Sequence, residues 1–170
     1  MKGRLTFTES IDIRVPRAAV WAYFDEPRNL YKWQPSLRDR EHVAGNPGRP
    51  GAVAKLVYDE GGRKLELTET ITLRVEPDAL AASYDSGMAM NRMHNRFVAL
   101  GDEATRWELQ AAFEFRGFPW QYIAFLFKGR IAKRLRDDME HFKEFVESSE
   151  GVPPEASSAE EEANSPEQGE

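Results

Sequence analysis

Apolar and polar residues alternate at the start of the chain. Among residues 4–15, the odd-numbered positions include Leu5, Phe7, Ile11, Ile13 and Val15, while the even-numbered positions are mostly polar. A period of two is typical of a strand with one buried face. Similar strand-length segments are predicted near 52–59, 63–75, 80–85, 88–99 and 105–116. Short Gly- and Asp-containing connections join several of them, which favours an antiparallel sheet with one face in water.

Two short helices are predicted after the first strand. Pro16 suits the first position of a helix, where its fixed φ is favourable and an N–H is not needed. Asp25 or Glu26 can cap a second helix that begins at Pro27. Pro35 ends it, because the residue before a proline is disfavoured in the α region.

The period changes to three or four residues from about Pro119 to Ser148. The apolar positions of this segment are Trp120, Ala124, Phe127, Ile131, Leu135, Met139, Phe142 and Val146. They form one stripe on a predicted continuous helix of about 40 Å. This stripe is expected to pack on the dry face of the sheet. The predicted order is therefore a strand, two short helices, six more strands, five of which are the segments named above, and a long closing helix, an α+β domain.

This order of elements resembles the SRPBCC or START-like superfamily, the helix-grip fold, and within it the polyketide cyclase/dehydrase branch. The resemblance spans residues 5–148 and rests on Pro16, Val20, Trp21, Phe24, Asp25, Asn29, Leu30, Trp33, Pro35, Leu37, Gly51, Thr105 and the closing segment MEHFKEFVES. It implies a seven-stranded antiparallel sheet curved around the C-terminal helix, with the two short helices closing one end. It also implies a deep cavity for a lipid, sterol, quinone, polyketide or similar molecule. Members of such a fold include enzymes, carriers and adaptors, so the resemblance does not choose among them.

Charge divides the chain into two parts. Residues 150–170 hold seven Glu and no Lys or Arg, and without them 23 basic residues face 22 acidic ones. The segment has almost nothing apolar to bury, so we expect a domain at 1–149 and a disordered acidic tail at 150–170. The chain contains no cysteine, no apolar run long enough to span a bilayer and no signal-peptide pattern. These features favour a cytoplasmic protein.

Two carboxylates interrupt apolar strand faces. Glu9 and Glu69 share the parity of apolar neighbours, and a carboxylate in a dry interior needs a partner or a raised pKa. Glu69 is the preferred polar anchor for a ligand. The alternative is that each carboxylate lies in water at a strand edge or pairs with an arginine such as Arg92 or Arg96.

Other candidates come from strand parity. Tyr58 and Tyr84 are predicted to point inward, either as core residues or as ligand contacts. In the strand 88–99, one parity places Asn91 and Asn95 inside, and the opposite parity places His94 inside. The sequence does not distinguish between these two orientations of the strand.

Several kinds of chemistry have no sequence signal. His42, His94 and His141 occur singly, without metal-ligand spacing, so no metal site is predicted. No dinucleotide, phosphate-binding or Ser–His motif is present, and no cofactor is expected. The near-neutral domain is a weak match for nucleic acid.

The start of the closing helix is apolar nearly all the way round. Tyr122, Phe125 and Leu126 exceed what one buried face requires, and basic residues follow directly. This surface is predicted to be covered by loops, to form a dimer patch, to gate the cavity, or to make transient contact with a membrane or protein. The oligomeric state is left open.

The leading hypothesis is a binding protein for a hydrophobic small molecule in an apolar cavity of about 300–1,000 Å³. The predicted lining is Tyr58, Glu69, Tyr84, Asn91, Asn95, Trp107, Phe113, Trp120 and Phe127. One alternative is a cyclase or dehydratase with Glu69 or His94 as acid/base and Tyr58 or Tyr84 as hydrogen-bond donor. The other is an adaptor that binds through Tyr122, Phe125 and Leu126.

Overall fold

The computed structural model describes residues 3–148, so the predicted acidic tail lies outside the described residues. The strands are β1 (Arg4–Ile13), β2 (Leu37–Ala44), β3 (Val53–Asp59), β4 (Lys64–Val75), β5 (Ala79–Asp85), β6 (Ala89–Ala99) and β7 (Thr105–Phe115). The helices are α1 (Arg17–Asp25), η1 (Pro27–Asn29), α2 (Leu30–Trp33), α3 (Trp120–Ile123), η2 (Ala124–Phe127) and α4 (Lys128–Ser148). Within the described residues, none of the helices is long and apolar enough to cross a membrane.

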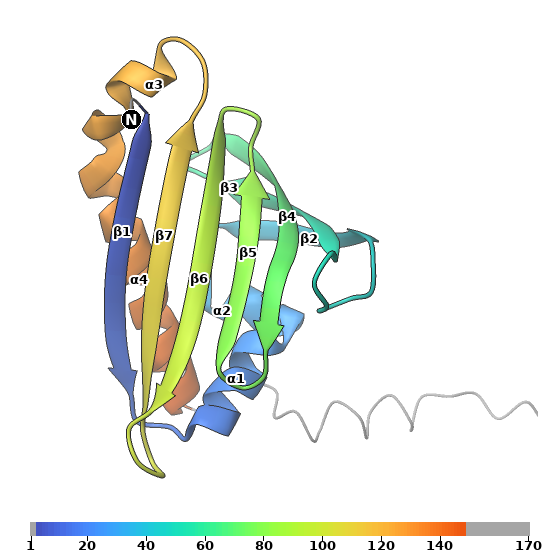
Figure 1. Ribbon diagram of the computed structural model, residues 1–170, viewed down its shortest axis with the longest axis vertical. Coiled ribbons are helices and arrows are strands. Elements are labelled where there is room, and N and C mark those ends of the chain that lie inside the picture. The colour runs from blue at the N-terminus through green and yellow to red at the C-terminus, as the bar shows by residue number, and fades with distance from the viewer. Residues whose placement is uncertain (1–2, 149–170) are drawn as a thin grey trace, which may run out of the picture.

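The seven strands form one antiparallel sheet in the order β1-β7-β6-β5-β4-β3-β2. Pairing of β1 with β7 brings the first and last strands of the domain together, with Ile13 opposite Thr105. Helix α4 runs across one face of the sheet, and α1 and α2 lie near one end of it (Figure 1). The predicted α+β helix-grip architecture, with its long C-terminal helical segment, is confirmed.

The closing helical segment is divided into three parts. It runs from Trp120 to Ser148, but the tighter 3₁₀ turns of η2 separate α3 from α4. Leu135, Met139 and Phe142 are buried as the predicted stripe requires. The predicted single helix therefore holds for α4, while its first eight residues form two short pieces.

A bulge in β4 reverses the facing of its last residues. Ile71 pairs with Ala82 and Leu73 pairs with Ala81, which leaves Thr72 as the extra residue. One extra residue shifts the parity of everything that follows it. As a result Leu73 and Val75, which unbroken alternation with Leu67 and Ile71 would place on the dry face, are exposed, and Arg74 points inward in their place.

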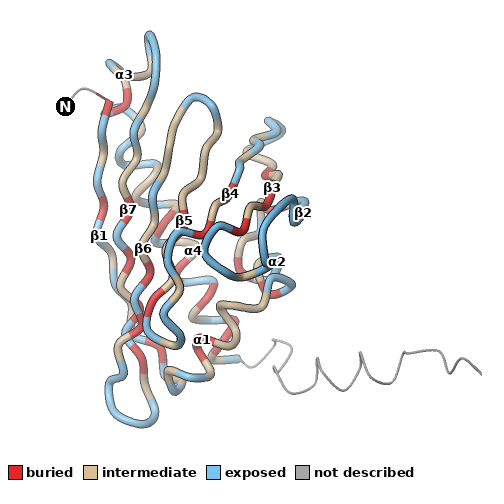
Figure 2. Tube along the Cα trace, turned by 45° about the vertical axis from the view of Figure 1, so that its right-hand side comes forward, coloured by how far each residue is buried: buried red, intermediate tan, exposed pale blue. Residues whose placement is uncertain are grey.

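An aromatic cluster joins the short helices, the sheet and α4. The ring of Phe24 contacts those of Trp33, Trp107 and Phe142 at centroid distances of 5.7, 5.3 and 5.6 Å. Trp107 in turn lies 5.2 Å from Phe142. Buried residues gather along the lower parts of β6 and β7, near α1, whereas the loop between β2 and β3 is mostly exposed (Figure 2). The break at Pro27 therefore lets both short helices contribute rings to one core.

Candidate functional site

A cavity of about 160 Å³ lies between the inner face of the sheet, α2 and α4. Much of its wall is apolar, with contributions from Phe24, Leu30, Trp33, Ile71, Trp107 and Met139. The volume is smaller than the predicted range of about 300–1,000 Å³. The reason is the aromatic cluster, in which Phe24, Trp33 and Phe142 fill space beside Trp107.

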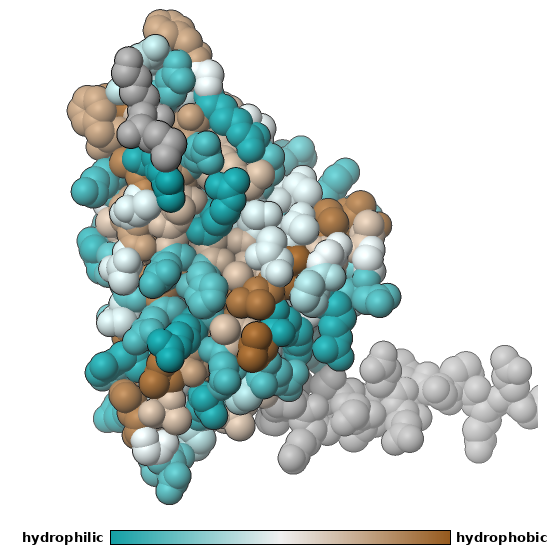
Figure 3. All heavy atoms as spheres, in the orientation of Figure 1, coloured by the Kyte–Doolittle hydropathy of each residue, from teal (hydrophilic) through white to brown (hydrophobic). Residues whose placement is uncertain are grey.

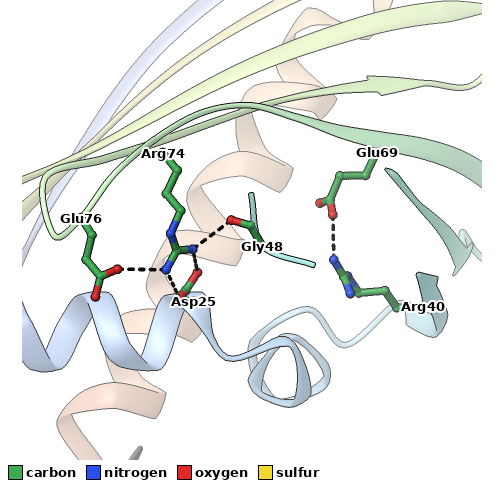
Figure 4. Close-up of polar contacts among 6 residues, drawn as sticks. All are labelled: Asp25, Arg40, Gly48, Glu69, Arg74 and Glu76. Atoms are coloured by element: carbon green, nitrogen blue, oxygen red, sulfur yellow. Dashed lines mark hydrogen bonds and ion pairs between the residues drawn. The ribbon is translucent and has the colours of Figure 1, made fainter. Parts of the chain in front are cut away.

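One buried ion pair provides the main charge in the cavity wall. Arg40 Nη2 of β2 donates to Glu69 Oε1 of β4 at 3.0 Å, and the two side chains are only 18% and 12% exposed (Figure 4). Both residues line the cavity. The alternative that Glu69 pairs with an arginine is therefore found, but the partner is neither Arg92 nor Arg96. Arg92 and Arg96 pair instead with Glu114 and Glu108, because their parity places them on the outer face.

Tyr84 is the cross-strand neighbour of Glu69 and also lines the cavity. Burial, followed by the negative charge of Glu69, raises the pKa of Tyr84 well above its ordinary value, and a hydrogen bond to Glu69 acts in the same direction. The Tyr84 hydroxyl therefore stays protonated at neutral pH and serves as a hydrogen-bond donor to the carboxylate.

Tyr58 lies beside the cavity, not in its wall. Its hydroxyl donates to Gln34 Oε1 at 2.8 Å, and Gln34 is the residue that lines the cavity. Burial raises the pKa of Tyr58 above its ordinary value. The Tyr58 ring packs with Leu37 and Leu56 in a smaller core cluster.

Asn95 reaches the cavity, but its amide is used within the protein. Its Oδ1 accepts from Trp107 Nε1 at 3.0 Å, and its Nδ2 donates to the carbonyl oxygen of Leu80 at 3.3 Å. Asn95 and Trp107 both line the cavity, as predicted from parity. The inward position of Asn95 decides between the two orientations of β6 that the sequence left open. Met93 and Phe97 point inside, and His94 points outside.

Five other candidates lie away from the cavity wall, among them His94, which faces a hollow on the outer side of the sheet. Phe113 packs on Phe7 with centroids 5.7 Å apart. Phe127 stacks on Phe115 at 6.4 Å and contacts Trp120 at 6.3 Å, at the α3 end of the molecule. The last is Asn91, whose buried Oδ1 has no hydrogen-bond partner among the described residues. The remaining candidate carboxylate, Glu9, pairs with Arg136 of α4 at 3.1 Å and does not line the cavity either.

Several polar residues of the wall were missed from the sequence, among them Arg40 and Asp138. Arg40 lies in β2, a strand that the alternation did not single out. Asp138 of α4 is adjacent to Met139 of the predicted stripe, which is the one signal that could have indicated it. Burial raises the pKa of Asp138, although its ion pair with Arg134 at 3.1 Å opposes this shift.

A second arginine holds the rim of the cavity together. Arg74 pairs with Asp25 at the end of α1, donates to the carbonyl oxygen of Gly48 at 3.2 Å and pairs with Glu76 at 3.1 Å (Figure 4). Its guanidinium also lies 5.2 Å from the ring centre of Trp21. Asp25 and Gly48 both line the cavity. Arg74 therefore ties the β2–β3 loop to α1 at the edge of the site.

The apolar start of the closing helix is not part of the cavity. Tyr122, Phe125 and Leu126 are exposed, and no residue of α3 or η2 lines the cavity. The prediction of a gate at the cavity mouth is therefore wrong. Among the described residues no cluster of three or more His, Cys, Asp or Glu could hold a metal ion. His42 is hydrogen-bonded to the carbonyl oxygen of Gly45 at 2.8 Å.

A curved sheet that grips a C-terminal helix over an internal cavity defines the helix-grip class of proteins. The chain belongs to the family described as polyketide cyclase / dehydrase and lipid transport, whose model matches residues 4–147. No curated protein matches the sequence. The family supports binding of hydrophobic small molecules in general, and leaves the ligand and any reaction open.

Solved structures share the fold at low sequence identity. The protein is similar to Ara h 8.0201, with 19% identity, a TM-score of 0.71 and coverage of 86% of this chain and 99% of that one. The ZhuI aromatase/cyclase of Streptomyces sp. R1128 is 14% identical, with a TM-score of 0.73 and coverage of 88% of this chain and 99% of that one. Norcoclaurine synthase from Thalictrum flavum, in complex with dopamine and hydroxybenzaldehyde, is 10% identical, with a TM-score of 0.67 and coverage of 89% of this chain and 91% of that one. These likenesses concern the fold alone.

Proposed function

We propose that the protein binds a small, mostly apolar molecule in the cavity between its sheet and α4. The observation that carries this proposal is a partly enclosed wall of aromatic and aliphatic side chains around one buried ion pair, Arg40–Glu69. Ligand sites are commonly apolar pockets with a few well-placed polar groups that fix orientation. Glu69, Tyr84, Asn95 and Trp107 are the predicted contacts that also line this cavity.

The volume limits the size of the ligand. An apolar cavity of about 150 Å³ accommodates one benzene-sized molecule. The cavity of about 160 Å³ therefore suits a single ring or a short chain while the Arg74 contacts hold the rim closed. A longer lipid, quinone or polyketide would require the β2–β3 loop to move.

Ethylbenzene tests the proposal, because Trp33 and Trp107 lie in the wall and report binding through tryptophan fluorescence. We expect a saturable change in emission with the full chain, and native mass spectrometry of freshly purified protein to detect any retained natural ligand. Ala54→Leu fills the cavity from the buried face of β3 and should weaken ethylbenzene binding at least tenfold. The matched control is Ala112→Leu, because Ala112 lies in the hollow on the outer face. Equal binding by both variants would contradict the proposal.

A catalytic role for the same cavity would depend on Glu69. It is buried, and Tyr84 is hydrogen-bonded to it, which favours it over His94 on the other face of the sheet as an acid or base. Glu69→Gln separates the two functions. It should abolish turnover of a substrate if the protein is a cyclase or dehydratase, and only weaken ligand retention if the protein is a carrier.

A second candidate function is docking to an anionic membrane through the exposed residues Phe118, Tyr122, Phe125 and Leu126, here called the α3 tip. Phe118, Phe125 and Leu126 are 84%, 67% and 65% exposed, and apolar side chains protrude at the α3 end of the molecule (Figure 3). Large apolar side chains exposed together are typical of an interaction surface.

Charge next to the α3 tip favours an anionic surface. Residues 115–136 hold six basic residues and no acidic one, although acidic residues outnumber basic ones in the whole chain. Lys128 and Arg130 are exposed and form no ion pair within residues 3–148, and they follow Phe125 and Leu126 by three and four residues. The first turn of α4 therefore places positive charge directly after the apolar residues of η2. A basic flank beside apolar side chains fits a bilayer containing anionic lipid.

Vesicle sedimentation of the full chain tests membrane docking. We expect binding to vesicles with about one third phosphatidylglycerol and little binding to pure phosphatidylcholine. Phe125→Asp with Leu126→Asp, or Lys128→Glu with Arg130→Glu, should reduce binding at least tenfold. Val43→Asp, at a half-exposed position on the opposite edge strand, should not. A concentration-dependent dimer that the Asp pair abolishes, without vesicle binding, would contradict docking.

A further inference from the structure

Two hydrogen-bond donors of the cavity wall have no partner among the described residues. They are Nε1 of Trp33 and Nε of Arg40, and both atoms are buried. Trp33 is only 4% exposed, and both side chains line the same cavity. Buried N–H groups without a partner are rare in folded proteins, because burial removes them from water.

The two donors differ from several other polar groups of the wall, which are already paired. The Trp107 indole donates to Asn95, the Tyr84 hydroxyl is bonded to Glu69, and the Asp138 carboxylate is paired with Arg134 of α4. Trp33 Nε1 and Arg40 Nε can only donate hydrogen bonds. A ligand that complements them must therefore bring an acceptor.

We propose that Trp33 and Arg40 form an oxygen-binding subsite, and that the ligand is a small ring compound carrying a neutral carbonyl group. The inference rests on the proposed binding function and specifies the chemistry of the ligand. In the bound state the carbonyl oxygen accepts from Trp33 Nε1 or Arg40 Nε, while the ring lies against the apolar wall formed by residues such as Leu30 and Ile71.

Charge in the wall distinguishes a carbonyl from a carboxylate. The positive charge of Arg40 is already balanced by Glu69 at 3.0 Å, and Asp138 adds another acidic group to the lining. An anionic ligand would therefore lie beside Glu69 and near Asp138 without a free cation to balance it, and like charges in a partly buried site repel. A neutral acceptor satisfies the two donors without this cost.

Three one-ring probes of similar size test the subsite in the full chain: ethylbenzene, acetophenone and benzoate. Ethylbenzene measures the apolar cavity alone, acetophenone adds a neutral carbonyl, and benzoate adds a charge. We expect acetophenone to bind at least fivefold more tightly than ethylbenzene, since one or two hydrogen bonds are gained. Benzoate should bind more weakly than acetophenone.

Variants assign the preference to the two donors. Trp33→Phe removes the indole N–H, and Arg40→Lys keeps a positive charge beside Glu69 but removes Nε. Each should bring the acetophenone-to-ethylbenzene ratio toward one. The matched control is Trp21→Phe, because Trp21 Nε1 is also buried without a described partner but does not line the cavity. It should leave the ratio unchanged.

The outcomes separate this inference from the proposed function. Equal binding of ethylbenzene and acetophenone would overturn the subsite and keep the cavity, as expected if ordered water satisfies both donors. Tighter binding of benzoate would overturn the assignment of a neutral ligand. Failure of all three probes to bind would overturn both the proposed function and the subsite. If Trp33→Phe unfolds, Arg40→Lys and the probe series still decide.

Discussion

Asn95 illustrates how one buried side chain holds together the sheet and the aromatic core. Its amide accepts from the indole of Trp107 and donates to the backbone of Leu80, so it connects β5, β6 and β7. Parity alone predicted that this amide faces the cavity. The sequence could not predict that both of its hydrogen bonds are made within the protein, because that depends on the rotamer of Trp107.

We predict that Asn95→Ala lowers the free energy of unfolding by about 2–4 kcal/mol, because it removes buried atoms and leaves the Trp107 N–H unpaired. Urea unfolding followed by tryptophan fluorescence measures the loss. Asn91→Ala is the control, since Asn91 has the same parity on β6 and its Oδ1 already lacks a described partner. A similar loss in both variants would contradict the role of the Asn95 hydrogen bonds.

Arg40 shows the limit of sequence reasoning about single residues. The alternation identified Glu69 as an inward carboxylate, and the structure places it in the cavity wall. Its partner lies 29 residues earlier and two strands away across the sheet. Since a carboxylate can pair with any nearby arginine, only the order of strands selects Arg40 over Arg92 and Arg96.

At the level of elements, β4 shows why periodicity failed locally. The alternation of residues 63–75 is regular in sequence, but the bulge at Thr72 turns Leu73 and Val75 outward. Nothing in the hydrophobic pattern indicates the bulge. The structure provides a reason for the new facing, because the inward Arg74 pairs with Asp25 of α1 and lies over Trp21.

We predict that Arg74→Met loosens the β2–β3 loop and costs about 1–3 kcal/mol, since the side chain is only 11% exposed and joins three segments. Hydrogen–deuterium exchange should become faster in residues 45–52 and at the end of α1. Arg49→Met, in the same loop and exposed, should leave exchange unchanged. Exchange that is equally slow in both variants would show that the loop does not depend on Arg74.

For the molecule as a whole, strand alternation, the proline positions and the helical stripe predict the architecture well. Each of them depends on residues that are close together in the sequence. Cavity volume is different. It depends on how the rings of Phe24, Trp33, Trp107 and Phe142 fill a shared space, and small changes in their rotamers alter it. The family and fold therefore follow from the sequence, whereas the size of the site does not.

The response of the whole fold to pH has two opposing parts. Hydrogen bonds hold the pKa below its ordinary value for Asp12 with Arg106, Glu26 with Arg28 and Asp137 with Lys133. A lowered folded-state pKa contributes stability above the ordinary values of 3.8 and 4.5, and this stability is lost as pH falls through the folded-state pKa. Asp138 acts in the opposite sense, because burial raises its pKa.

We predict opposite effects of two Asp→Asn substitutions on the midpoint of thermal unfolding. Asp138→Asn should raise the midpoint at pH 7, because the folded state of the wild type must hold a charged carboxylate that burial disfavours, while Arg134 keeps its pair with Glu60. Each kcal/mol gained corresponds to roughly 2–4 °C in a chain of this size. Asp12→Asn should lower the midpoint at pH 7, because its ion pair with Arg106 is lost. As the pH falls, the effect of Asp138→Asn should disappear first, because the raised pKa of Asp138 makes it take up a proton at a higher pH than Asp12 does. A shift of the same sign in both variants at pH 7 would contradict the opposing roles of the two groups.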